Sequence, residues 1–191
     1  MNASINSGYL EGQLLVATPN VTGDHFSKSV ILMCAHSAEG AMGIIINHTL
    51  DNVRYADLFE QLALPNDILQ ENLAVHYGGP VEVNRGFVIY EHEGQFKDEA
   101  MLTVGQIAIS GTLGVLKAIA AGKGPRRSLL ALGYAGWSAG QLESEMKENS
   151  WFSVPASMDL IFERSNAKKW ERAAMLQGVD LRKFSTVAGN A

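Results

Sequence analysis

One cysteine and a histidine two positions later could together support catalysis. Cys34 and His36 could form a thiolate–imidazole pair, in which the histidine accepts the thiol proton. Both residues fall in an apolar run typical of a strand, where side chains two positions apart are about 7 Å from each other. That separation is too long for a hydrogen bond, and a buried cysteine behaves as a small apolar side chain. We expect an unreactive core thiol, with a reactive or ligand-facing thiol as the alternative.

A Gly-Gly-Pro sequence followed by an arginine could form a receptor for a negatively charged group. Gly79 permits a backbone conformation with positive φ, and Pro80 restricts the chain after it. The guanidinium of Arg85 can bind a carboxylate or another anion. The alternative is structural: Arg85 pairs with an internal carboxylate such as Asp24 or Glu143 and orients loops. We favour the structural ion pair.

The segment 133–151, GYAGWSAGQLESEMKENSW, combines glycines with a helical pattern. Ser138 and Gln141 fit a capping box, and Glu143 lies in the first turn, where the helix dipole favours an anion. A glycine turn before a helix can also present backbone amides to a ligand. The sequence lacks both glycine-rich phosphate-binding patterns, and the first-turn acid would repel an anion. We interpret this stretch as a structural turn, with ligand contact as the alternative.

The remaining candidates are two tryptophans and the histidines. Trp137 and Trp151 flank the acidic helix, and we interpret them as core residues, with an aromatic binding platform as the alternative. Glu143 and Glu145 are two positions apart on a helix and therefore diverge. The histidines, at positions 25, 36, 48, 76 and 92, show no metal-binding spacing. We predict neither a metal site nor a cofactor.

Composition limits the classes of function. The chain has 191 residues, of which 47% are hydrophobic and 18% charged, so we expect one domain over 1–191, with residues 1–8 flexible. A net charge of −5 argues against broad contact with nucleic acid. Cys34 has no partner for a disulfide, the N-terminal sequence is unlike a signal peptide, and no apolar run is long enough to span a bilayer. We expect a cytoplasmic protein that does not contact membranes.

The predicted elements must hold the candidate residues in place. The run 30–36 is apolar at both alternating sets of positions, which indicates a strand covered on both faces. The segment 37–40 would join it to the strand 41–48 as a hairpin. Helices are expected at 53–64, capped by Asp51 or Asn52, at 110–125, within 133–151 after a cap at Ser138, and at 165–178, the last with Leu176 inward. Further strands or extended segments are expected at 12–18, 73–77, 86–93, 126–137 and 154–163. This irregular order predicts an α+β fold with a large mixed β-sheet and helices packed on it.

Four segments, taken in order, resemble the AlgH/YqgE family of bacterial proteins. They are ATPNVTGDHFSKSVILMCAHSAEGAMGIIINH, YGGPVEVNRGFVIYE, GKGPRRSLLALGYAGW and the segment 133–151. The resemblance covers nearly the whole chain and implies a compact α+β domain around a large mixed sheet. It supplies no family-wide catalytic residues. Two segments depart from the family pattern: AISGTLGVL, where relatives commonly carry an aspartate, and the ending GNA with Asn190, where relatives often end in Gly-His-Ala.

We expect a cytosolic protein that binds a small molecule or a protein partner at a loop-lined cleft. The cleft would form where the Gly-Gly-Pro loop, the loop around Asp24 and the stretch 133–137 meet. Its candidate residues are Asp24, Cys34, His36, Gly79, Pro80, Arg85, Trp137, Gln141 and Glu143. One alternative is a thiol-dependent enzyme or hydrolase that uses Cys34 with His36 or Arg85. Another is a transcription-related regulator, suggested only by the alginate-regulator label of one relative and opposed by the acidic charge.

Overall fold

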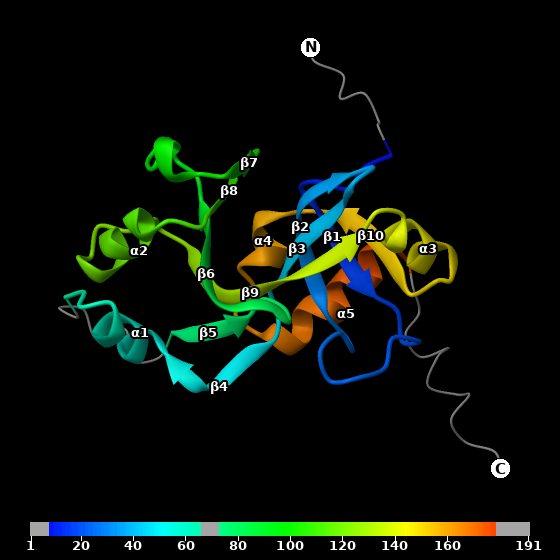
Figure 1. Ribbon diagram of the computed structural model, residues 1–191, viewed down its shortest axis with the longest axis horizontal. Coiled ribbons are helices and arrows are strands. Elements are labelled where there is room, and N and C mark those ends of the chain that lie inside the picture. Colours follow the sequence, from blue (N-terminus) through cyan, green and yellow to red (C-terminus); the bar gives the residue numbers. More distant parts are fainter. Residues whose placement is uncertain (1–7, 66–72, 179–191) are drawn as a thin grey trace.

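The computed structural model describes residues 8–65 and 73–178 (Figure 1). Residues 1–7, which were expected to be flexible together with residue 8, lie outside this range. Asn190, where the sequence departs from the family pattern, also lies outside it. The strands are β1 Gln13–Ala17, β2 Val30–Ser37, β3 Gly40–Ile45, β4 Thr49–Arg54, β5 Ala74–Tyr77, β6 Val81–Glu91, β7 Leu102–Val104, β8 Ile107–Ser110, β9 Ser128–Ser138 and β10 Trp151–Pro155. The helices are α1 Tyr55–Gln61, α2 Leu113–Ala120, α3 Gln141–Lys147, α4 Met158–Ile161, α5 Asn166–Leu176 and the short 3-10 helix η1 Lys97–Glu99. None of the helices in the described ranges combines the length and the apolarity needed to cross a bilayer.

The strands form one large curled sheet, which confirms the predicted α+β class. Its order is β10-β1-β2-β3-β9-β6-β8-β7, with β4 and β5 attached beside β9. Neighbouring strands are antiparallel except for β5 and β9, which run parallel and make the sheet mixed. β9 pairs with β3 through its C-terminal half and with β5 and β6 through its N-terminal half. This one strand therefore holds the two halves of the sheet together.

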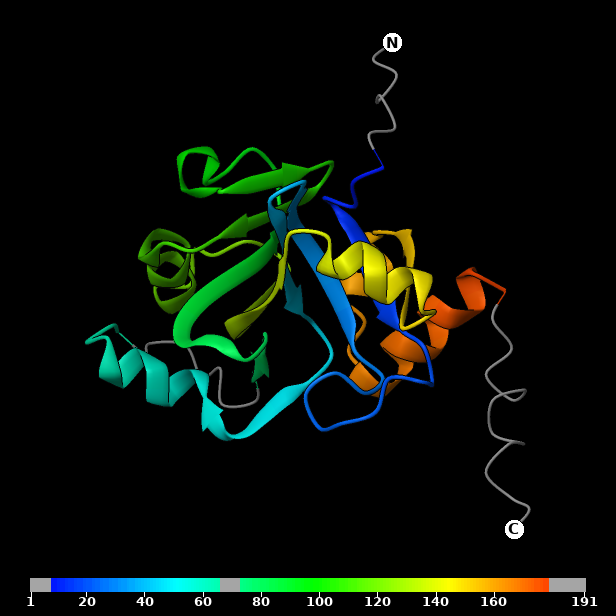
Figure 2. The ribbon, with the colours of Figure 1, turned by 45° about the vertical axis from the view of Figure 1, so that its right-hand side comes forward.

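Helices cover both faces of the sheet, as the apolar pattern of β2 predicts. Leu32 and Cys34 face the cluster that contains α4 and α5, whereas Ile31 and Met33 face α3. Figure 2 shows α3 (yellow) lying across the blue strands, with α5 (orange) on the other side. A third apolar cluster packs α1 and α2 on β6, β8 and the first half of β9. The predicted hairpin is confirmed, but Ser37 pairs with Gly40, so the connection has two residues rather than the predicted 37–40, and β3 ends at Ile45.

The glycine-rich stretch 133–137 is part of β9, so the predicted turn at this position is wrong. The turn comes later, at Gly140, whose φ of 75° provides the left-handed conformation before α3. Gly140, not Ser138, is the residue before the helix. One half of the capping box is present, because Gln141 reaches back to accept a 3.0 Å hydrogen bond from the N–H of Ser138. Of the two glycines in this stretch, Gly133 serves close backbone packing, since a Cβ atom there would lie 2.4 Å from the carbonyl oxygen of Gly79.

Other predictions of local structure also differ. Helix α2 begins at Leu113 rather than at 110, and strand β6 begins at Val81 rather than at 86. α1 follows strand β4 directly, and Arg54 precedes it, so neither Asp51 nor Asn52 caps the helix. The segment 154–163 contains helix α4, because the side chain of Ser157 caps it by accepting from the N–H of Leu160. Leu176 is 63% exposed because it is the last residue of α5, although it lies on the same side of the helix as the buried Lys169 and Ala173.

Candidate functional site

The structure brings His36 and Glu143 into direct contact. Nε2 of His36 lies 2.9 Å from a carboxylate oxygen of Glu143, and Nδ1 accepts a 3.0 Å hydrogen bond from the N–H of Leu10. This arrangement requires the neutral imidazole to carry its proton on Nε2. The N–H of Glu143 itself and then His36 lower the pKa of the carboxyl group. His36 thus joins β2, α3 and the N-terminal segment, and both of its ring nitrogens are engaged.

The two tryptophans share one carboxylate. The indole N–H groups of Trp137 and Trp151 donate to the same oxygen of Glu145, at 2.9 and 2.8 Å. The side-chain amide of Gln141 donates to the other oxygen at 2.9 Å. Both indoles are buried, and their rings meet edge to face with centroids 6.0 Å apart. The carboxylate oxygens are used within this network, which orients α3 on the sheet.

Cys34 is a buried thiol. Its Sγ lies 3.5 Å from the carbonyl oxygen of Leu32. Burial, and to a lesser extent the charge of Glu11, raise the pKa of the thiol to about 12. Because His36 bonds to Leu10 and Glu143, it is not available to accept the proton of Cys34. These contacts favour the core interpretation over the thiol-dependent enzyme.

The Gly-Gly-Pro loop and the stretch 133–137 lie against each other. The N–H of Gly78 donates to the carbonyl of Leu132 at 2.7 Å. A Cβ atom on Gly79 would lie 2.1 Å from the carbonyl carbon of Tyr134, and the φ of Gly79 is 149°. Gly79 is therefore needed for the close approach of two backbones, and Pro80 follows at the surface.

The expected ion pair of Arg85 with Asp24 or Glu143 is wrong. Arg85 donates to Glu82 at 3.0 Å, and its side chain is 52% exposed beside the ring of Phe87. The reason is that β6 begins at Val81, which places Glu82 and Arg85 on the same short segment. Glu143 is already bound by His36.

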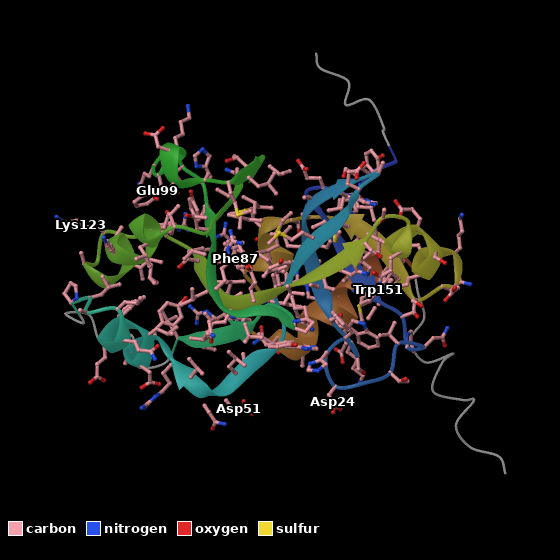
Figure 3. The ribbon with its side chains drawn as sticks, viewed as in Figure 1. Asp24, Asp51, Phe87, Glu99, Lys123 and Trp151 are labelled. Atoms are coloured by element: carbon pink, nitrogen blue, oxygen red, sulfur yellow. The ribbon has the colours of Figure 1, made fainter. Side chains whose placement is uncertain are left out.

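Asp24 and Arg85 do not share a cleft. A shallow cavity of about 460 Å³ at Arg85 is lined only by residues of the segment 80–85. Asp24 is exposed at the outer edge of its loop, well away from Phe87 (Figure 3). Its neighbour His25 holds the loop near β5 through a 2.9 Å hydrogen bond with the hydroxyl of Tyr77. The predicted residues thus lie in several separate contacts.

A larger cavity, of about 720 Å³, lies at the N-terminal ends of β5 and β9. Because these two strands are parallel, Ala74 and Ser128 begin them at the same edge of the sheet. Tyr55 of α1 and Ile119 of α2 line one part of the wall, and five residues from the segment 162–169 line another. The cavity is therefore enclosed by helices that pack on different clusters of the sheet.

Positive charge dominates this cavity. Four cationic side chains line it, together with the single carboxylate of Glu163; the cations are those of Arg126, Arg127, Arg164 and Lys169. Arg127 is held by Glu91 through two hydrogen bonds of 3.0 and 3.1 Å. Arg126 and Arg164 are exposed and pair with no carboxylate within the described ranges. Their guanidinium groups are free to bind an anion.

Two buried titratable groups also line the cavity. The side chain of Lys169 is fully buried, and its Nζ donates to the carbonyl of Ile46 at 2.7 Å. Burial lowers the pKa of this amine to about 8, although the charge of Glu163 acts against it. Burial and then the charge of Lys169 lower the pKa of His76 to about 4. Nε2 of His76 lies 3.4 Å from Asn166, and Nδ1 has no hydrogen-bond partner in the described part of the chain. A cleft with such perturbed groups is a candidate binding or catalytic site.

The comparisons with known proteins decide the family. The AlgH-like family model matches residues 14–182. The chain belongs to the AlgH-like family. A UPF0301 protein of Afipia carboxidovorans is 43% identical over 198 residues, covering 99% of this chain and 93% of the relative. A UPF0301 protein of Rhodospirillum rubrum is 44% identical over 187 residues, covering 97% of this chain and 96% of the relative.

Two solved structures share the AlgH-like fold. The solution structure of AlgH from Pseudomonas aeruginosa is 36% identical, with a TM-score of 0.76 and full coverage of both chains. The crystal structure of DIP2367 from Corynebacterium diphtheriae has a TM-score of 0.75 at 21% identity, covering 92% of this chain and 91% of that one. At this identity, the similarity to DIP2367 is evidence for the fold alone. The predicted family resemblance is confirmed.

The sequence does contain a signal for the cavity of this AlgH-like protein. Two short cationic stretches, GKGPRR at 122–127 and ERSNAKK at 163–169, contribute all four of its cations. By their glycine, proline and helical patterns, these stretches indicate only strand and helix boundaries. The overall charge of −5 concealed their local excess of positive charge.

Proposed function

We propose that this AlgH-like protein binds a small anionic molecule in the cavity at the N-terminal ends of β5 and β9. One observation carries the proposal: four cations and a single carboxylate line one cavity of an otherwise acidic protein. The volume of about 720 Å³ supports a small molecule, since such pockets measure about 300–1,000 Å³. We also propose a cytoplasmic location, which the single cysteine supports because no disulfide can form within the chain.

Some charged groups in the cavity are paired with other residues and some are not. The unpaired ones are exposed, which favours binding of an anion near the opening of the cavity. Arg127 is neutralised by Glu91, and Glu163 is engaged by Arg172. Arg126 and Arg164 keep their charge exposed to the cavity. Guanidinium groups bind carboxylates and phosphates through paired hydrogen bonds, each of which is stronger than a neutral one. The exposed arginines would therefore make first contact with the ligand.

Calorimetric titration with phenyl phosphate, citrate and benzoate, with neutral benzamide as the reference, tests this proposal. We expect the anions to bind and benzamide not to bind. Replacing both arginines, in R126Q/R164Q, should weaken binding by at least about tenfold, because each charge-assisted hydrogen bond contributes about 1.5 kcal/mol or more. High salt should also weaken binding by screening the exposed charges.

Arg85→Gln is the matched control, since it removes an exposed guanidinium from the shallow cavity at 80–85. We expect it to bind the anions like the wild type. Loss of binding in Arg85→Gln but not in R126Q/R164Q would move the site to the surface predicted from the sequence. If no anion binds, the proposed function is wrong.

A further inference from the structure

We propose that the ligand of this cavity is a multiply charged anion of the phosphate monoester class, which binds against the ammonium group of Lys169 and causes the protein to take up a proton. This inference rests on the proposed function. It adds the chemical class of the ligand, a buried group of the wall that the ligand binds, and a linkage between binding and pH.

The position of Lys169 carries the first part of the argument. Its side chain is fully buried, and the described residues provide it with no ion pair, only the carbonyl of Ile46. A buried ammonium without a counter-charge is costly, and proteins lower that cost by pairing the charge or by losing the proton. Glu163 favours the charged form of Lys169 but forms its ion pair with Arg172, so an anion in the cavity would supply a direct partner for Lys169. The charged form of Lys169 would then predominate to a higher pH.

Among the titratable groups that line the cavity, Lys169 is the one whose protonation changes between pH 7 and pH 10. His76 on β5 has a pKa lowered to about 4 and is therefore neutral over this range. Glu163 has a lowered pKa and is bound by Arg172, so it stays ionised. Burial raises the pKa of Tyr55 further above its ordinary value, so it stays neutral. The three arginines in the wall, Arg126, Arg127 and Arg164, remain charged at all these pH values.

The excess of cations indicates an anion with more than one charge. Arg127 is paired with Glu91, and Glu163 is paired with Arg172. Three cations in the wall, those of Arg126, Arg164 and Lys169, are left without an ion pair in the described ranges, so a monoanion would compensate for only one of them. A phosphate monoester carries nearly two negative charges above its second pKa of about 6. Its three terminal oxygens can also accept from several donors at once. Apolar side chains in the same wall, including Leu73, Ile119, Leu129 and Phe162, would contact the ester group.

Calorimetry of phenyl phosphate in two buffers with different ionisation enthalpies measures the number of protons taken up on binding. Because the pKa of Lys169 in the free protein is about 8, we expect little uptake at pH 7 and most of one proton at pH 9. Affinity should fall about fivefold from pH 8 to pH 9, since the fraction of charged Lys169 falls by that factor. The charge of phenyl phosphate is constant over this range, so it does not contribute to the effect.

Substitutions show which residue takes up the proton when phenyl phosphate binds. Lys169→Met should weaken the binding of phenyl phosphate and abolish proton uptake. Lys169→Arg should keep binding and also abolish uptake, because the guanidinium is charged throughout. Lys168→Met is the matched control, as it removes an exposed lysine next to Lys169 that does not line the cavity. It should leave both the affinity and the uptake unchanged.

The outcomes separate this inference from the proposed function. If phenyl phosphate binds without proton uptake at pH 9, or no more tightly than the monoanion benzenesulfonate, the inference is overturned and the proposed function stands. If neither phenyl phosphate nor any other anion tested binds, both fail. The wild-type protein alone provides the decisive measurement, so an unstable variant does not obscure the result.

Discussion

The carboxylate of Glu143 meets Nε2 of His36 at 2.9 Å, although 107 residues separate them in the sequence. Nδ1 of the same ring accepts from the N–H of Leu10. One imidazole therefore fastens helix α3 and the segment before β1 to strand β2. The histidine considered as a catalytic partner of Cys34 instead joins three parts of the chain.

Glu143→Gln should lower the free energy of unfolding at pH 7 by about 0.5–1 kcal/mol, a small effect because the carboxylate is half-exposed. The folded-state pKa of Glu143 lies below its ordinary value. Its stabilising effect is therefore present above the unfolded-state pKa and is lost as the pH falls through the folded-state value. Urea unfolding at pH 7 and pH 3 should show the difference between variant and wild type only at pH 7. Glu39→Gln, an exposed substitution in the β2–β3 turn, should show no difference at either pH.

Glu145→Ala should destabilise the protein by roughly 2–3 kcal/mol, because it leaves two buried indole N–H groups without an acceptor. Glu145→Gln keeps one carbonyl oxygen and should cost less. Near-ultraviolet circular dichroism, which reports on the setting of the tryptophans, should change more in the alanine variant. Glu148→Ala, one residue past the end of the same helix, serves as the control, and an effect as large as that of Glu145→Ala would contradict this account.

Cys34 should resist thiol reagents in the folded protein. With a pKa of about 12, only about one thiol in ten thousand is ionised at pH 8, and the side chain is also buried. Iodoacetamide should label Cys34 in urea but not under native conditions, as mass spectrometry can show. Rapid labelling of the native protein would instead support the thiol-dependent enzyme.

Gly79→Ala should cost about 2–3 kcal/mol or prevent folding, because the added methyl would overlap the backbone of Tyr134. Gly140→Ala is the control for conformation alone. Gly140 also has positive φ but has open space around its Cβ position, so its replacement should cost only about 1 kcal/mol. Thermal unfolding of both variants compares the two effects. Equal losses would show that the close approach at Gly79 is unimportant.

Lys169→Met should stabilise the ligand-free protein at pH 7. The folded-state pKa of Lys169, about 8, is lower than its ordinary value of 10.5, so the unfolded chain binds more protons between these values. Wild-type stability should therefore rise with pH from 8 to 10, and the advantage of the variant should shrink over the same interval. Chemical unfolding at pH 7, 8, 9 and 10 measures this change. A constant difference between the two proteins would mean that Lys169 does not titrate in this way.

Local patterns were sufficient to predict much of the sheet and little of the cavity. The run 30–36 is apolar on both faces because β2 is covered on both faces, so its place inside the sheet could be inferred. The glycines at 133–137 were misread, because glycine marks both turns and close backbone contacts, and only the packing of Gly79 against Tyr134 distinguishes the two. The cations of the cavity come from segments about 40 residues apart in the sequence. Their convergence depends on tertiary packing that places Arg127 beside Phe162 and Asp159, which no local pattern records.

The central place of β9 also determines when this protein can fold during its synthesis. Its partners β3, β5 and β6 are made before it, and they cannot be joined until residues 128–138 have left the ribosome. Until then, the apolar strands on either side have exposed edges that invite pairing with other chains. The sheet therefore stays incompletely paired until β9, which is synthesised after these partners, is available.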